Sequence, residues 1–105
     1  MKFLLLVCVD PAITPDSDSA AEWVDLVGPA RILGNQLVEP ADGKTVRVRD
    51  NETVLTDGPF AETKEYMAGF DIIECADMDD AVRIAASHPV ARFGSIEVRA
   101  FAPNT

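Results

Sequence analysis

An α+β domain with an antiparallel sheet is predicted by three features of this 105-residue sequence. Segments of strand character are interrupted by two segments of helical periodicity. The first strand segment and the one after the central hairpin are apolar on both of their alternating faces, which places them in the middle of a sheet. The last strand segment alternates apolar with charged residues, as expected of a strand with one covered face.

The first part of the chain predicts a strand, a loop, a helix and a short extended segment. Residues 2–9 form the strand, and the loop that follows contains Pro11 and Pro15. The stretch from Ser19 to Glu22 has capping-box spacing and begins a helix over 20–30. Gly28-Pro29 falls inside that helix, so a kink or an end is expected there. An extended piece then runs over 32–38.

The second part predicts a hairpin, a strand, a helix and a last strand. The hairpin pairs 45–49 with 53–56 through an Asp50-Asn51 turn, and 66–75 is the next strand. Asp77 caps the second helix, which His88-Pro89 ends, and 95–101 is the last strand. The expected core face of that helix consists of Met78, Ala81, Val82, Ala85 and Ala86.

This order of elements is the split βαβ arrangement of ferredoxin-like domains, in which two helices cover one face of the sheet. Strands 2–9 and 66–75 are then central, and each has apolar residues on the face that the helices leave open. An apolar face of that size needs a cover. A second copy of the chain is the simplest cover, so the sequence predicts a homodimer.

The nine residues 57–65, Asp-Gly-Pro-Phe-Ala-Glu-Thr-Lys-Glu, form the most specific motif of the chain. Gly58-Pro59 stops the preceding strand, and Asp57 is placed to accept hydrogen bonds from the amides that follow. This run resembles the signature of the DGPF proteins, a branch of the YCII-related family. The resemblance extends over nearly the whole chain in element order and, more weakly, in the letters of the 94–99 segment.

The resemblance implies a dimeric α+β barrel, with two ferredoxin-like sheets face to face. It leaves three classes of function open. The first is a pocket for a small molecule between the two sheets, with acid-base chemistry by Asp57. The second is a non-catalytic regulatory or interaction protein associated with an extracytoplasmic-function sigma factor, and the third is a cofactor-free monooxygenase.

Asp57 and His88 are the candidate catalytic residues. Asp57 either faces a pocket or only caps the turn. His88 is the single histidine, at a helix C-terminus whose dipole favours the charged imidazolium, and it is equally suited to ending the helix. In the wider YCII group, a histidine on the first helix forms a proposed catalytic dyad with an aspartate. The predicted helix 20–30 contains no histidine, so that dyad does not transfer directly.

Five further residues are candidates for ligand binding. Asp71 is a carboxylate in an apolar strand, and Glu97 and Arg99 share one face of the last strand. Together these three indicate a polar cavity between the two sheets of the dimer. The alternative for Glu97 and Arg99 is a charged edge strand. The motif contributes Phe60 and Lys64, and Lys64 could hold an anionic group.

The composition argues against several partners and cofactors. Nine basic against 18 acidic residues give a net charge of −9, which disfavours direct binding to nucleic acid or to an anionic membrane. Two cysteines and one histidine are too few for a structural zinc site, and no nucleotide or flavin motif is present, so no cofactor is expected. The apolar run after Met1 is shorter than a signal peptide requires and lacks a cleavage site. We therefore expect a cytoplasmic protein with Cys8 and Cys75 as buried, reduced thiols.

Overall fold

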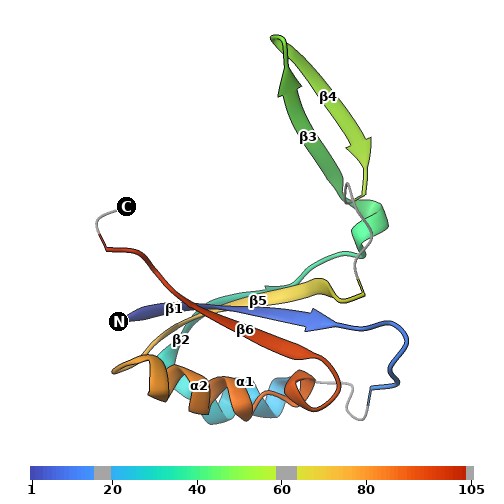
Figure 1. The fold of residues 1–105 in the computed structure, drawn as a ribbon. Helices are drawn as coiled ribbons and strands as arrows, with labels where there is room; N and C mark the ends of the chain where they lie inside the picture. The colour runs from blue at the N-terminus through green and yellow to red at the C-terminus, as the bar shows by residue number, and fades with distance from the viewer. Residues whose placement is uncertain (16–19, 59–63, 104–105) are drawn as a thin grey trace.

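The computed structural model describes residues 1–15, 20–58 and 64–103, and within them the chain forms a four-stranded sheet, a separate hairpin and two α-helices (Figure 1). The elements are β1 (Lys2–Val9), α1 (Ala21–Val27), β2 (Arg31–Gln36), β3 (Lys44–Arg49), β4 (Glu52–Asp57), β5 (Tyr66–Glu74), α2 (Met78–Ala86) and β6 (Ser95–Ala100). Short 3-10 turns follow α1 at Gly28–Ala30, precede the hairpin at Pro40–Asp42 and follow α2 at Pro89–Arg92. None of the described helices is long and apolar enough to cross a membrane.

The main sheet has the strand order β2-β5-β1-β6, with antiparallel pairing throughout. This is the ferredoxin-like order, and the two strands predicted to be central, β1 and β5, are central. They pair along their whole length, from Lys2 opposite Glu74 to Val9 opposite Tyr66. Both edges of β1 and both edges of β5 are paired, so their backbone groups are hydrogen-bonded within the sheet. Their side chains are apolar on both faces, which is typical of strands in the middle of a sheet.

Both helices cover one face of this sheet, as predicted (Figure 1). The core between the helices and the sheet contains Phe3 and Leu5 from β1 and Ile73 from β5, all fully buried. Trp23 of α1 is also buried, and its indole Nε1 donates to the carbonyl of Ile84 at 3.1 Å. This bond ties α1 to α2 across the helix layer.

The helix α2 begins as predicted, because the Asp77 side chain accepts a hydrogen bond from the amide of Asp80 at 2.9 Å. Its core face is rotated from the predicted one. Ala81 and Ala85 are buried, whereas Met78 and Val82 are exposed. Ile84 packs against the core in their place. The two alanines form the centre of the buried face of α2, and Ile84 lies at its border.

The helix α1 is shorter than predicted, since its regular part ends at Val27. Gly28 adopts a φ of 58°, a left-handed conformation that stops the helix, and Gly28–Ala30 continues as a 3-10 turn. The expected end at Gly28-Pro29 is therefore confirmed. The predicted cap at Ser19 lies outside the described residues.

The hairpin β3–β4 pairs only with itself and stands away from the main sheet on the face opposite the helices (Figure 1). Asp50 and Asn51 both have positive φ, 52° and 65°, as a two-residue type I′ turn requires. The split βαβ order has its second strand between the first helix and the strand 66–75, and both the extended segment and the hairpin fall in that interval. The extended segment before the hairpin, β2, occupies the edge of β5.

Candidate functional site

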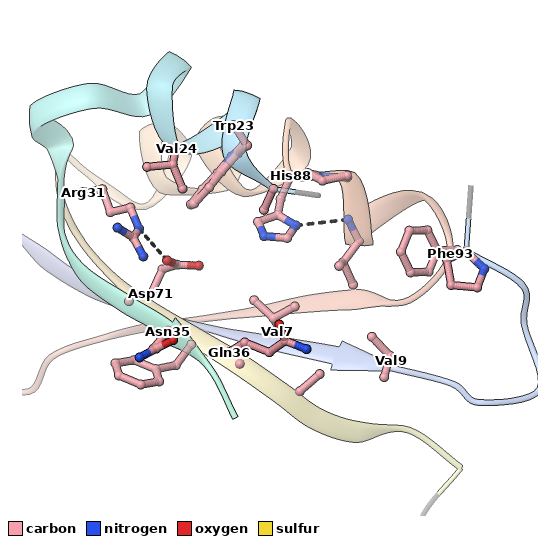
Figure 2. Close-up of a pocket in the computed structure, with 18 residues that line it drawn as sticks. Val7, Val9, Trp23, Val24, Arg31, Asn35, Gln36, Asp71, His88 and Phe93 are labelled. Atoms are coloured by element: carbon pink, nitrogen blue, oxygen red, sulfur yellow. Dashed lines mark hydrogen bonds and ion pairs between the residues drawn. The ribbon is translucent and has the colours of Figure 1, made fainter. Parts of the chain in front are cut away.

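A pocket of about 480 Å³ lies between the helix layer and the sheet, at the end where β2 and β1 leave the sheet (Figure 2). Its apolar wall comes from β1, α1 and the segment after α2, with Val7, Val9, Trp23, Val24, Val90 and Phe93. Its charged residues and histidine are Arg31, Asp71 and His88, and the polar residues Asn35 and Gln36 of β2 also line it. The pocket therefore combines a large apolar surface with a small group of polar side chains, as ligand sites generally do.

Asp71 is the buried charge of this pocket, with a relative exposure of 6%. It lies in the middle of β5, on the face that the helices cover. From the adjacent strand β2, the Nε of Arg31 donates to Asp71 Oδ1 at 2.8 Å. A buried carboxylate without a partner is strongly unfavourable, and Arg31 provides that partner.

Gly34 makes room for this ion pair. It lies directly opposite Asp71 in the β2–β5 register. A Cβ atom at position 34 would meet Asp71 Oδ1 at 2.0 Å and an Arg31 Nη atom at 2.6 Å. The strand therefore needs a glycine here, because the pair lies flat against its backbone.

His88 is held in the pocket wall by a hydrogen bond from a backbone amide and by contact with the Trp23 ring. His88 is 4% exposed, and its ring lies 4.7 Å from the Trp23 ring, centroid to centroid. Its Nδ1 accepts a hydrogen bond from the amide of Val90 at 3.0 Å, so the side chain caps the 3-10 turn Pro89–Arg92. Figure 2 shows the other edge of the ring turned toward the side of the pocket that holds Asp71.

Burial lowers the pKa of His88 below its ordinary value, and the nearby Asp71 carboxylate opposes this shift only in part. The sequence had suggested that the α2 dipole would favour the charged form. That expectation is wrong, because His88 lies beyond the helix end and is removed from water. The hydrogen bond from Val90 acts in the same direction, since Nδ1 must be unprotonated to accept it.

The predicted site residues fall into separate regions, and only Asp71 and His88 share the pocket. Asp57 is the last residue of β4, has a side-chain exposure of 81% and pairs with Lys44 across the hairpin. It is not part of the pocket wall. The amides that it was expected to cap fall mainly in 59–63, outside the described residues, as does Phe60.

Lys64 also lies outside the pocket wall. Its side chain is 87% exposed, and its Nζ lies 3.9 Å from the Oδ2 of the buried Asp10. This contact is the ion pair that the structure gives Lys64, so its charge faces a carboxylate of the same chain.

Glu97 and Arg99 lie on the open face of the sheet, whereas Asp71 lies on the helix face. Glu97 is opposite Leu6 in the β1–β6 register, and Asp71 is opposite Leu5. The predicted polar cavity of Asp71, Glu97 and Arg99 is therefore not formed within one chain, because neighbouring positions of a strand point to opposite faces. Glu97 and Arg99 pair with each other at 3.7 Å, and both are exposed.

Sequence analysis missed Arg31, Gly34 and Trp23 as pocket residues. Gly34 carried a signal, since a glycine inside a strand often marks the close approach of another group. Arg31 and Trp23 carried no such signal in the sequence. Local patterns do not show, for example, that an arginine at the start of β2 faces an aspartate forty residues later. Among the described residues, no group of three or more histidine, cysteine or acidic side chains is placed to hold a metal ion.

The two thiols lie at different ends of the sheet and are not paired with each other. Burial raises the pKa of Cys8, as do the nearby Glu65 and Glu97 carboxylates. Burial also raises the pKa of Cys75, with Asp80 adding to the shift. Both thiols are half-buried rather than fully buried as predicted, and the raised pKa favours the protonated form of a structural cysteine.

The ferredoxin-like sheet, with two helices on one face and a pocket beneath them, defines a small α+β domain. The sequence matches the YCII-related domain over residues 2–104, and the chain belongs to this family. It is also similar to an uncharacterized protein of Rhizobium meliloti (strain 1021), with 44% identity over 69 residues. That match covers 64% of this chain and 56% of the relative, so the chain spans about half of the curated protein's length.

Proposed function

We propose that this protein binds a small molecule in the pocket formed by Arg31, Asp71, His88 and the apolar wall around Trp23. The observation that carries this proposal is the convergence of Arg31, Asp71 and His88, of which Asp71 and His88 are buried, on a mainly apolar pocket of about 480 Å³. Buried polar groups that face a cavity are a common feature of binding sites. The site lies under the helices, not in the cavity between two sheets that the sequence had suggested.

Any acid-base chemistry in this pocket falls to Asp71. The Nδ1 lone pair of His88 is used by Val90, so the neutral ring has no free lone pair to take up a proton. Asp71 uses Oδ1 for Arg31 and has a second carboxylate oxygen for a ligand. Asp71 thus takes the role that the sequence had given to Asp57.

The test is a screen of a small-metabolite cocktail by ligand-observed NMR against the wild type and three variants. Gly34→Ala should abolish binding, because the new methyl group displaces the Arg31–Asp71 pair. Gly43→Ala is the matched control, since a Cβ there meets its nearest neighbour at an ordinary 3.4 Å. Asp57→Asn should bind normally. Loss of binding in Asp57→Asn with normal binding in Gly34→Ala would instead indicate a site around Asp57, at the end of β4.

We also propose that a second copy of the chain covers the open face of the sheet. The helices leave this face uncovered (Figure 1), and its central strands present Leu4, Leu6, Phe70 and Ile72, each only partly buried. Phe70→Asp should produce monomers or unfold the protein, and light scattering at micromolar concentration measures the mass. A monomeric wild type would contradict the proposal.

The hairpin favours a second candidate function, that of an interaction protein. One side of β3–β4 presents Val46, Val48 and Leu55, all more than half exposed. An isolated hairpin with an apolar side is only marginally stable in water, which favours contact with another surface. The sigma factor that the family resemblance implies can be tested directly: titration with the purified factor should give saturable binding that Leu55→Asp abolishes.

A further inference from the structure

The hydrogen-bonding state of His88 is fixed by the fold. Because Nδ1 accepts from the Val90 amide, the proton of the neutral ring must lie on Nε2. Nε2 makes no hydrogen bond within the described part of the chain. Every fully buried side-chain nitrogen or oxygen there has a hydrogen-bond partner, so an atom without a partner is not fully buried. Nε2 is therefore accessible, and His88 presents an N–H donor to the pocket that it lines.

Asp71 presents the complementary acceptor. Arg31 occupies Oδ1, and no second hydrogen bond to Asp71 is formed by the described residues. By the same argument as for His88, the other carboxylate oxygen is accessible. The two groups are near enough for the Asp71 charge to act on the His88 ring. His88 and Asp71 thus place one donor and one acceptor near each other in the polar wall.

The formal charge of this wall is zero. The positive charge of Arg31 is matched by Asp71, and His88 is neutral. An anion bound to the remaining guanidinium N–H groups of Arg31, or a cation bound to the free oxygen of Asp71, would bring a charge into the pocket that no group of this pair compensates. Either ligand is disfavoured, because an uncompensated buried charge is strongly unfavourable. The net charge of −9 on the chain adds to the penalty for an anion.

We infer that the pocket selects an uncharged ligand with an apolar body and a polar end that joins a hydrogen-bond acceptor to a donor, such as a primary amide or a hydroxy-carbonyl group. The acceptor takes the Nε2 proton of His88, and the donor binds the free oxygen of Asp71. This inference rests on the proposed function and specifies the ligand class of that site.

Three probes of one size separate the charge classes: benzamide, benzoate and benzamidine. His88 is the only histidine of the chain, so ¹⁵N-histidine labelling gives signals from this ring alone. Benzamide should shift the Nε2 signal and bind roughly tenfold or more tightly than either charged probe, because a buried polar group left unpaired weakens binding by about that factor. Tighter binding of benzoate or benzamidine would overturn the inferred ligand class but would still support the proposed binding site. Failure of all three probes to bind in the pocket would count against both.

Two variants change the charge of the wall and should reverse the preference. Asp71→Asn leaves Arg31 without its carboxylate and should favour benzoate, whereas Arg31→Gln leaves Asp71 uncompensated and should favour benzamidine. Should either variant fail to fold, the wild-type spectrum still decides, since the ¹⁵N shifts of the apo protein distinguish a proton on Nε2 from one on Nδ1. A proton on Nδ1 would overturn the inference.

Discussion

Arg31 and Asp71 form a 2.8 Å ion pair across the adjacent strands β2 and β5, under the helix layer and over the bare backbone of Gly34. The pair sets the polarity of the pocket, because it introduces charge into an apolar layer and cancels that charge in the same place. Two residues that are forty positions apart in the sequence therefore set the charge of the pocket wall together.

Removal of one partner of this ion pair should lower the free energy of unfolding much more than removal of both partners. Arg31→Ala leaves the Asp71 carboxylate, 8% exposed, without its cation and should lower the free energy of unfolding by about 3 kcal/mol. The double variant Arg31→Met with Asp71→Leu should recover most of that loss. Urea denaturation measures all three proteins. The exposed Glu97–Arg99 pair is the control, since Glu97→Gln should change stability by less than about 1 kcal/mol.

Stability should fall as the pH drops below about 6.5, where a histidine in the unfolded chain takes up its proton. The pKa of His88 is lowered in the folded protein, so the unfolded chain binds that proton first. The stability that neutral, buried His88 contributes is fully present above pH 6.5 and is lost as the pH falls through the lowered pKa of His88. Asp71, the carboxylate that acts on His88, opposes the loss only in part.

Melting temperatures between pH 5 and 8 measure this effect. His88→Gln has no titrating group at this position and should show a flatter profile over the same range. Equal slopes in the two proteins would mean that other groups cause the pH dependence.

Asp57→Asn should be nearly silent. The Asp57 side chain is 81% exposed, and its partner Lys44 is 62% exposed, so the pair contributes at most about 1 kcal/mol. Asparagine also retains the ability to stabilise a turn. Thermal unfolding and ligand binding should both resemble the wild type. If binding collapsed while stability was unchanged, the carboxylate of Asp57 would belong to the site after all.

Both cysteines should react slowly with a thiol reagent at neutral pH in the native protein. The pKa of each is raised above its ordinary value, mainly by burial, so the reactive thiolate is scarce. In denaturant both thiols should be labelled at the rate of a free thiol. Rapid labelling of Cys8 or Cys75 without denaturant would show an activated thiol and a nucleophilic role.

The element order, the central strands and the cap of α2 follow from local patterns. The two-sided apolar character of β1 requires a place inside a sheet, and Asp77 caps α2 through an amide three residues away. The Asp50-Asn51 turn is equally local, because two positive φ values are needed between two strands. Such features depend on neighbours in the chain, which the sequence displays directly.

The site depended on contacts between distant segments. The sequence determined that Asp71 is a charge in an apolar strand and that His88 ends a helix, but not that the two residues share a pocket. Only the tertiary structure decided that, since the β2–β5 register places Arg31 beside Asp71, and the close packing of α2 on the sheet brings His88 beneath Trp23. Burial then lowers the pKa of His88 and makes it a neutral donor. The charge state of a side chain depends on what surrounds it in space, and the sequence alone does not specify those surroundings.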